Sequence, residues 1–418
     1  MNLLIFNIKK LVQVEEEPRL LVAGKDMATV NTIDNAYLII KGDVIEDFGP
    51  MEKLEKIRKD LQIDKGIDAT GKMVFPSFCD SHTHLVYAGS REIEYVDKIK
   101  GLSYEEIAKR GGGILNSAKL LHETSEEELY LQAMERIHEI IGLGTGAVEI
   151  KSGYGLSVAD ELKMLRVIKR IRESSPIIVR ATFLGAHAIP ADYKERQGEY
   201  VDLIINEMLP LVAFDELADY IDVFCDQGFF TQEETERMLM AGIKHGMRGK
   251  IHANELANSG GIQVGVKYGA LSVDHLEFTG PQEIKCLLNS ETMPTLLPGA
   301  AFFLGMVYPP ARKMIDAGLP VAMASDYNPG SSPSGDMKFV MSLGCIMMKM
   351  TPEEVINATT INSAYAMGVS DIVGSIARGK IANLFITKPI SSIEFMPYAF
   401  TAKLVDKVIL KGKIIEHS

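Results

Sequence analysis

Two histidines that lie two residues apart, His82 and His84, are the residues of this chain best suited to bind a metal ion. They end a short apolar run that includes Val74-Phe75-Pro76, and on a strand both imidazoles project from one face. Two neutral imidazoles at the mouth of a sheet or barrel supply half of a metal site. A pair of partly exposed loop histidines would have the same spacing, so this pair alone does not show that the chain binds a metal ion.

Three further titratable residues, His252, His275 and Asp326, fall at the ends of later apolar segments. Any one of them could have a purely structural role. However, four of the nine histidines of the chain lie at the ends of such segments, and structural roles explain this pattern poorly. A divalent cation bound by His82, His84, His252 and Asp326 would keep a position open for water. The cation would lower the pKa of that water and make hydroxide available near neutral pH.

The predicted catalytic residues surround this metal site. Glu255 lies three residues after His252, close enough to take a proton from the water and pass it on. A solvated loop carboxylate is the alternative reading of Glu255. His275 is preceded by Asp274 and could polarise the attacked carbonyl group, with its tautomer fixed by a nearby acceptor. Asp326 completes the catalytic set.

The elements that must carry these residues alternate between strand and helix. Apolar strand candidates end near residues 84, 151, 187, 226, 254, 275, 298 and 326, and amphipathic stretches at 125–143, 157–172, 231–245 and 281–288 lie between them. Ser125 with Glu128, and Thr231 with Glu234, have the spacing of capping boxes. This order predicts an α/β fold with a (β/α)8 TIM-type barrel. A doubly wound sheet is the competing fold, but no glycine-rich nucleotide fingerprint follows any strand.

Both ends of the chain are predicted to be rich in strands, at residues 3–12, 36–41, 44–48, 382–387, 405–410 and 414–415. We expect residues 1–73 and 373–418 to form one small β-sandwich domain, and residues 74–372 to form the barrel. Two separate flanking modules are the alternative, but each would be marginally stable alone.

Composition limits the partners and the compartment. The chain has 418 residues, 46% of them hydrophobic, and a net charge of −12, which argues against nucleic acid or an anionic membrane surface as a partner. Four scattered cysteines without a C-x-x-C pair fit a reducing compartment. The first residues lack the features of a signal peptide, and no apolar run approaches the ~20 residues of a membrane span. We expect a cytoplasmic homodimer, the commonest oligomer of soluble enzymes.

The metal ligands and Glu255 resemble those of the amidohydrolase superfamily in its one-metal form. Two-metal members bridge their ions with a carboxylated lysine at the end of strand four. Here the predicted strand four ends at Asp226, and Lys151 ends strand two. The one-metal form is therefore favoured, although a strand count off by one would bring Lys151 back as a candidate bridge.

Longer motifs give a closer resemblance, to the imidazolonepropionase family of histidine degradation. The similar segments follow one another in order over nearly the whole chain: 82–91 (HTHLVYAGSR), 149–156 (EIKSGYGL), 182–187 (TFLGAH), 252–255 (HANE), 273–275 (VDH) and 325–331 (SDYNPGS). The resemblance implies hydrolysis of the ring amide of 4-imidazolone-5-propanoate to N-formimidoyl-L-glutamate, with zinc or iron as the cofactor. The ligand types alone suit zinc, iron(II) and manganese equally.

The resemblance also implies a site for an anionic substrate. Arg91 lies seven residues past a metal ligand and is suited to hold the substrate carboxylate through two parallel hydrogen bonds. Tyr154 and His187 follow strands two and three and become substrate-binding residues, as does Glu255.

The last loop supplies the remaining substrate contacts. Asn328, Gly330 and Ser331 follow Asp326 there, and an amide donor with a close glycine backbone could hold the polar ring or the product. Tyr104 is a weaker candidate for the carboxylate pocket, and Gly111-Gly112-Gly113 reads as a loop over the substrate.

Two other functions share parts of this pattern. A deaminase of heterocyclic amines would have the same metal ligands, but one acting on neutral bases would not need the carboxylate-binding Arg91, Tyr154 and His187. A non-catalytic barrel serving as a scaffold usually loses ligands, and here no ligand position is vacant. Release of ammonia would distinguish the deaminase.

Overall fold

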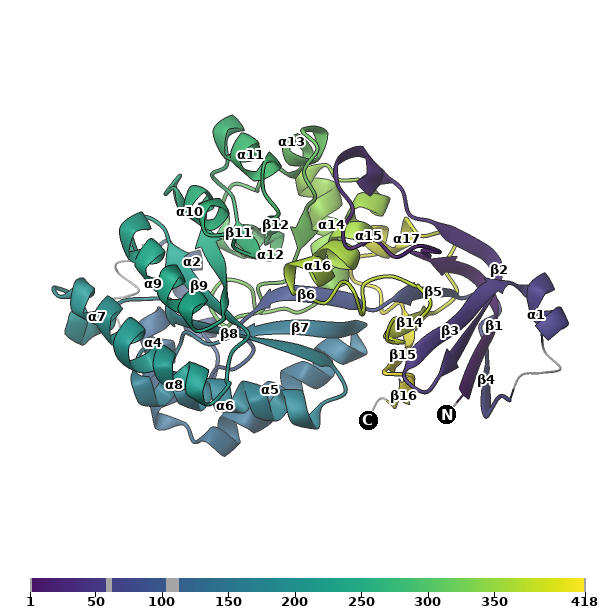
Figure 1. Ribbon diagram of the computed structural model, residues 1–418, viewed down its shortest axis with the longest axis horizontal. Coiled ribbons are helices and arrows are strands. Elements are labelled where there is room, and N and C mark those ends of the chain that lie inside the picture. Colours follow the sequence, from purple (N-terminus) through teal and green to yellow (C-terminus); the bar gives the residue numbers. More distant parts are fainter. Residues whose placement is uncertain (1, 58–61, 103–112, 417–418) are drawn as a thin grey trace.

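The computed structural model describes residues 2–57, 62–102 and 113–416. These residues form two eight-stranded sheets, which Figure 1 shows side by side. One sheet is parallel and is surrounded by helices. The other is built from both ends of the chain, and the N- and C-termini lie close to it. The predicted fold class, a TIM-type barrel with a small β domain from both termini, is confirmed.

The barrel strands are hydrogen-bonded in sequence order. Their bounds are β6 (Phe78–Thr83), β7 (Thr145–Lys151), β8 (Ile178–Ala186), β9 (Tyr220–Cys225), β10 (Arg248–Ala253), β11 (Ser272–His275), β12 (Met293–Leu296) and β13 (Ala322–Met323). The strands are almost wholly buried because helices cover the outside and side chains fill the inside, as expected for parallel strands.

The barrel closes at a seam between its first and last strands. A parallel bridge joins Thr83 to Tyr327, the Asp326 N–H donates to the His82 carbonyl at 3.0 Å, and the His84 N–H donates to the Tyr327 carbonyl at 2.9 Å. The seam therefore runs through three of the predicted site residues.

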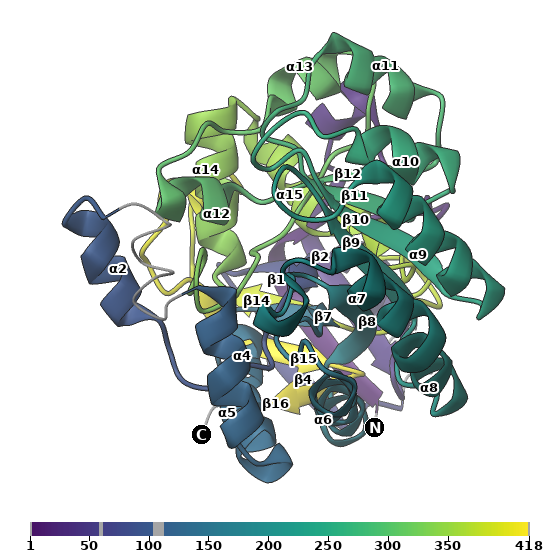
Figure 2. The same cartoon turned by 90° about the vertical axis from the view of Figure 1, so that its left-hand side faces the viewer.

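Helices follow most strands and surround the barrel, as the end-on view in Figure 2 shows. Their bounds are α2 (Glu92–Ile99), α4 (Ile114–Glu123), α5 (Glu126–Gly142), α6 (Val158–Ser174), α7 (Gln197–Leu203), α8 (Leu209–Phe214), α9 (Gln232–Lys244), α10 (Gly261–Lys267), α11 (Pro281–Leu288), α12 (Pro298–Leu304), α13 (Ala311–Asp316), α14 (Met337–Met348), α15 (Pro352–Thr359) and α16 (Ile361–Ala366). The four predicted helical stretches correspond to α5, α6, α9 and α11. In the described part of the chain no helix is long and apolar enough to cross a bilayer.

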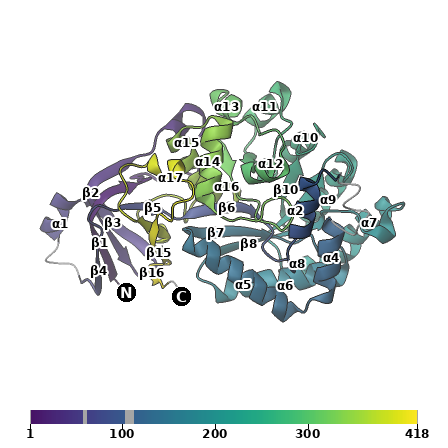
Figure 3. The same cartoon turned by 180° about the vertical axis from the view of Figure 1, so that it is seen from behind.

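Local sequence signals fix where these helices begin. The Ser125 side chain accepts the Glu128 N–H at the start of α5, and Thr231 and Glu234 form the complete reciprocal box at the start of α9. Buried residues of α5 recur three or four apart, so one face of the helix packs on the barrel. Figure 3 shows α5 and α6 on the same side of the barrel strands.

The second sheet has the order β16-β15-β14-β5-β1-β2-β3, and β4 pairs with β1. The bounds are β1 (Asn2–Val12), β2 (Thr32–Lys41), β3 (Val44–Pro50), β4 (Lys65–Asp68), β5 (Met73–Pro76), β14 (Leu384–Thr387), β15 (Val405–Leu410) and β16 (Lys413–Ile415), with the short helices α1 (Met51–Ile57) and α17 (Phe395–Tyr398) nearby. One apolar core joins strands from both ends of the chain. The predicted division at residue 73 stays a prediction, and β5 is hydrogen-bonded within this sheet.

Candidate functional site

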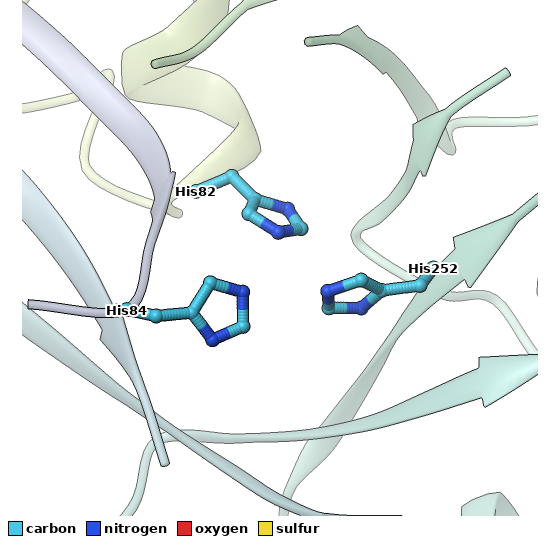
Figure 4. A group of neighbouring side chains, drawn as sticks. All are labelled: His82, His84 and His252. Carbon is cyan, nitrogen blue, oxygen red and sulfur yellow. The ribbon is translucent and has the colours of Figure 1, made fainter. Parts of the chain in front are cut away.

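Three histidines converge inside the barrel. His82 on β6, His84 directly after it and His252 on β10 are all buried, and one ring nitrogen of each lies within 4.8 Å of the others. Figure 4 shows the three rings directed toward a common centre. Because β6 and β10 are the first and fifth barrel strands, the histidines meet across the barrel.

Buried carboxylates lie beside two of these rings. Asp274 Oδ2 lies 2.6 Å from His82 Nδ1, and Asp222 Oδ2 lies 3.0 Å from His252 Nδ1. The Nε2 atoms of both histidines are buried and have no hydrogen-bond partner among the described residues. Burial lowers the pKa of His82 and His84 well below the ordinary value, so these imidazoles are neutral. Unpartnered ring nitrogens with a carboxylate on the opposite side of the ring fit a metal ion.

Asp326 joins the histidines from the loop after β13. Its Oδ1 lies 3.6 Å from the Nε2 atoms of both His82 and His84. Burial raises the pKa of Asp326 to about 7, and a nearby cation would favour its charged form. Its φ of 55° is a left-handed conformation that residues other than glycine rarely adopt, and such strain collects at functional sites.

Glu255 and His275 lie beside the histidine cluster. Their side chains approach to 3.6 Å between Oε2 and Nε2. Burial, together with the charges of Asp326 and Asp226, raises the pKa of Glu255 to about 8. The Glu255 loop is held by Asp226, whose Oδ2 accepts the Glu255 N–H at 2.7 Å. A carboxyl group with this pKa can both take and return a proton near neutral pH.

One cavity of about 800 Å³ connects the predicted residues. All of the predicted metal, catalytic and substrate-binding residues line it except His82, which lies fully buried behind the wall. Apolar side chains from α12 and from Phe224 and Phe229 form another part of the wall. Tyr104, Gly111 and Gly112 lie outside the described residues.

Arg91 reaches the cavity from the start of α2. Its Nε and Nη2 donate to Glu94 Oε2 at 2.9 and 2.5 Å, so Glu94 fixes the plane of the guanidinium group. The other side of the guanidinium group packs on Gly330, where an added Cβ would overlap Nη1 and Cζ. Lys98 lies seven residues after Arg91, about two helical turns further on, and its Nζ donates to the Gly330 carbonyl at 3.3 Å.

Two of these contacts were absent from the sequence-based prediction. Glu94 and Lys98 lie three and seven residues after Arg91 on the same helix. That helical spacing is the signal that could have identified them. Together the three side chains carry one net positive charge beside Gly330.

His187 stacks on His84 of the histidine cluster, and Tyr154 lies beside it at a tilt. The His187 ring lies 5.1 Å from that of His84 and 5.3 Å from that of Tyr154, measured between centroids. His187 Nδ1 is 3.0 Å from the Gly153 carbonyl, and burial lowers the pKa of His187 to about 3. Burial also raises the pKa of Tyr154, so both side chains are neutral hydrogen-bonding groups.

The last loop is organised by Asn328 itself. Its Oδ1 accepts the N–H groups of Gly330 and Ser331, both at 2.8 Å, and its Nδ2 donates to the Asp326 carbonyl at 2.7 Å and to Ser331 Oγ at 2.8 Å. The amide therefore shapes the loop around Asp326 and Gly330. A role of Asn328 in holding a ligand stays a prediction.

Residues 73–415 match the amidohydrolase family. The imidazolonepropionase of Flavobacterium johnsoniae is 58% identical over 412 residues, covering 99% of both chains, and that of Christiangramia forsetii is 56% identical over 415 residues, covering 99% of this chain and 100% of the other.

Solved structures give more distant matches. A triazine hydrolase variant superimposes with a TM-score of 0.73 at 15% identity, over 99% of this chain and 94% of the other. An adenosine deaminase from Xanthomonas campestris with bound zinc superimposes with a TM-score of 0.69 at 17% identity, over 99% and 92%. At these identities the two structures support the fold alone.

Proposed function

Because the chain belongs to the amidohydrolase family and, within it, to the imidazolonepropionases, we propose that it hydrolyses the ring amide of 4-imidazolone-5-propanoate. The product is N-formimidoyl-L-glutamate, and the reaction is a step of histidine degradation. The observation that carries the proposal is that His84 and His252 of the histidine cluster line the same cavity as Arg91. A metal-type site and a cationic subsite in one cavity match a substrate with a cyclic amide and a carboxylate tail.

His82, His84, His252 and Asp326 would hold one divalent cation, zinc or iron. The unpartnered Nε2 atoms of His82 and His252 and the nearby Asp326 carboxylate support this ligand set. When bound, the cation supplies Lewis acidity that activates water and polarises the amide carbonyl. All other steps belong to side chains of this chain.

Glu255 moves the proton. It takes a proton from the attacking water as the oxygen of that water bonds to the ring carbonyl carbon. His275, whose Nε2 is 3.6 Å from Glu255 Oε2, stabilises the negative charge that develops on the carbonyl oxygen. Glu255 then gives the proton to the leaving ring nitrogen as the C–N bond breaks, and the new carboxylic acid loses its remaining proton to water to become a carboxylate.

Arg91, Tyr154 and His187 bind the substrate in this proposal. The Arg91 guanidinium group faces the propanoate carboxylate, while Tyr154 and His187 offer neutral hydrogen-bonding groups toward the ring. Ser331, with Gly330 and Asn328, borders the ring from the last loop. We also expect a homodimer in the cytoplasm, where an acidic protein with a small anionic substrate needs neither nucleic acid nor a membrane.

The test of this function is ultraviolet spectroscopy of freshly generated imidazolone propanoate with metal-loaded enzyme. We expect the ring absorbance to disappear without release of ammonia. Ammonia release would instead identify a deaminase, and no turnover by fully metal-loaded enzyme would reject the substrate.

Arg91→Ala is expected to raise KM about 10²-fold with a smaller change in kcat. Loss of a charge-assisted contact to a carboxylate costs roughly 3 kcal/mol, and each 1.4 kcal/mol is about tenfold. Arg196→Ala is the matched control, because Arg196 also precedes a helix and pairs with a glutamate three residues on, Glu199. Steady-state kinetics would contradict the role of Arg91 if both variants kept the wild-type KM.

Gly330→Ala is expected to raise KM at least about tenfold through Arg91. A Cβ at residue 330 would overlap the guanidinium group, which must then move away from the substrate carboxylate. The open space at Gly228, where a Cβ would meet nothing within 4 Å, makes Gly228→Ala a control for a glycine replacement, although its φ of 87° adds backbone strain of its own. An unchanged KM in Gly330→Ala would show that Arg91 does not need this packing.

A further inference from the structure

A buried charged network lies beside the three converging histidines. It consists of Glu149 and Lys151 on β7, Asp222 on β9, Lys250 on β10 and Asp274 on β11, all with side chains that are essentially inaccessible to solvent. Glu149 accepts hydrogen bonds from both lysines. Charged groups are buried in this way only when they are paired, so the network has a cost that its contacts must offset.

Lys151 is the centre of this network. Its Nζ lies 2.8 Å from Asp222 Oδ2, 2.6 Å from Glu149 Oε1 and 3.6 Å from Asp274 Oδ2. Although burial acts in the opposite direction, the neighbouring carboxylates raise the pKa of Lys151 above its ordinary value, so the side chain stays an ammonium group.

The carboxylate oxygens that face Lys151 are the same atoms that face the histidines. Asp222 Oδ2 contacts His252 Nδ1, and Asp274 Oδ2 contacts His82 Nδ1. Without a cation between them, two carboxylates directed at one point would repel and turn away. His82 would then lose the acceptor of its ring hydrogen bond, and His252 would lose the carboxylate oxygen that faces its Nδ1.

We propose that Lys151 is a positioning residue of the metal site, whose ammonium group holds Asp222 and Asp274 in the orientation that directs His252 and His82 toward the metal ion. One side chain on the second barrel strand thereby aligns ligands from the first and fifth strands. The inference rests on the metal site of the proposed function. It gives Lys151 a role that differs from bridging two metal ions, since its Nζ is already surrounded by carboxylates.

The test is the zinc affinity of metal-free Lys151→Met, measured by competition with a chromophoric chelator. We expect a 10- to 100-fold weaker affinity, the usual effect of removing a group that orients metal ligands. Nitrogen-15 NMR of the histidine rings in the metal-free protein supplies a second readout, and we expect the ring signals of His82 and His252 to shift or broaden in the variant.

Lys380→Met is the matched control. Lys380 is also a buried lysine, but its Nζ donates to the Ser370 and Val373 carbonyls and to Ser375 Oγ. Both variants lose a buried ammonium group and should unfold at lower denaturant concentration. Only Lys151→Met should lose zinc affinity.

Three results would overturn the inference. They are a wild-type zinc affinity in Lys151→Met, unchanged histidine signals, or an equal loss of affinity in Lys380→Met. If Lys151→Met does not fold, Lys151→Gln, which keeps a donor but removes the charge, is measured against the same criteria. A wild-type protein that binds no zinc would reject the metal site of the proposed function and the inference together, whereas wild-type binding with an unaffected Lys151→Met rejects the inference alone.

Discussion

Replacing Glu255 with glutamine is expected to lower kcat by about 10² to 10⁴-fold, the range typical of a lost general acid–base group. Glutamine keeps the size and hydrogen-bonding shape of the side chain but cannot take or give a proton. The metal content should stay close to the wild-type value, because Glu255 is not among the proposed metal ligands. Steady-state kinetics with metal analysis of the same samples is the measurement.

The pH profile separates this role from a structural one. Burial raises the pKa of Glu255 to about 8, and a base must be ionised to act, so kcat/KM should fall as the pH drops through that pKa. A bound cation lowers the pKa, which puts the midpoint of this ascending limb at or below about 8. The limb should be absent in Glu255→Gln. A variant that kept both the limb and the wild-type kcat would exclude Glu255 as the base.

The second large effect is expected for His252→Ala. Removing one of three converging imidazoles should empty the metal site and lower kcat at least about 10³-fold, since a catalytic ion contributes several kcal/mol to transition-state stabilisation. His245→Ala is the matched control, because His245 lies on the surface at the end of α9. Metal analysis by mass spectrometry, together with kinetics before and after added zinc, gives the result.

Zinc should restore chelator-treated wild-type enzyme and the His245→Ala control, but not His252→Ala. Full activity of the chelator-treated enzyme, after analysis has established that it contains no metal, would contradict a metal-dependent reaction. Retention of metal by His252→Ala at wild-type occupancy would contradict the ligand set.

The sequence indicated which candidate side chains would lie near one another, because strand ends are a strong signal. His82, His252, His275 and Asp326 each end an apolar run, and in a parallel barrel those ends open on one face. The structure brings His252, His275 and Asp326 together with Glu255 in a single cavity, and His82 lies buried behind its wall. The position of Arg91, seven residues after His84, likewise indicated that its side chain would reach the same cavity, and it does.

The contacts that support the site residues could not be predicted from the sequence, because they depend on distances across the barrel. Nothing in the periodicity of β7 indicates that Lys151 meets Asp222 and Asp274, which lie on β9 and β11. The pairing of Glu94 with Arg91 depends on side-chain rotamers as well as on helical spacing. The sequence also suggested that the apolar residues of β5 begin the barrel. In the structure these residues are hydrogen-bonded to β1 and β14, in the sheet that is built from both ends of the chain.

The seam of the barrel has a consequence for how the protein is made. The edge of β6 that carries His82 pairs with residues 326–327, which are synthesised more than half a chain length later. During translation that edge has no partner, and an unpaired strand edge can join a strand of another chain. The nascent protein is therefore most exposed to aggregation until its last barrel strand leaves the ribosome, and the complete metal site can form only after that moment.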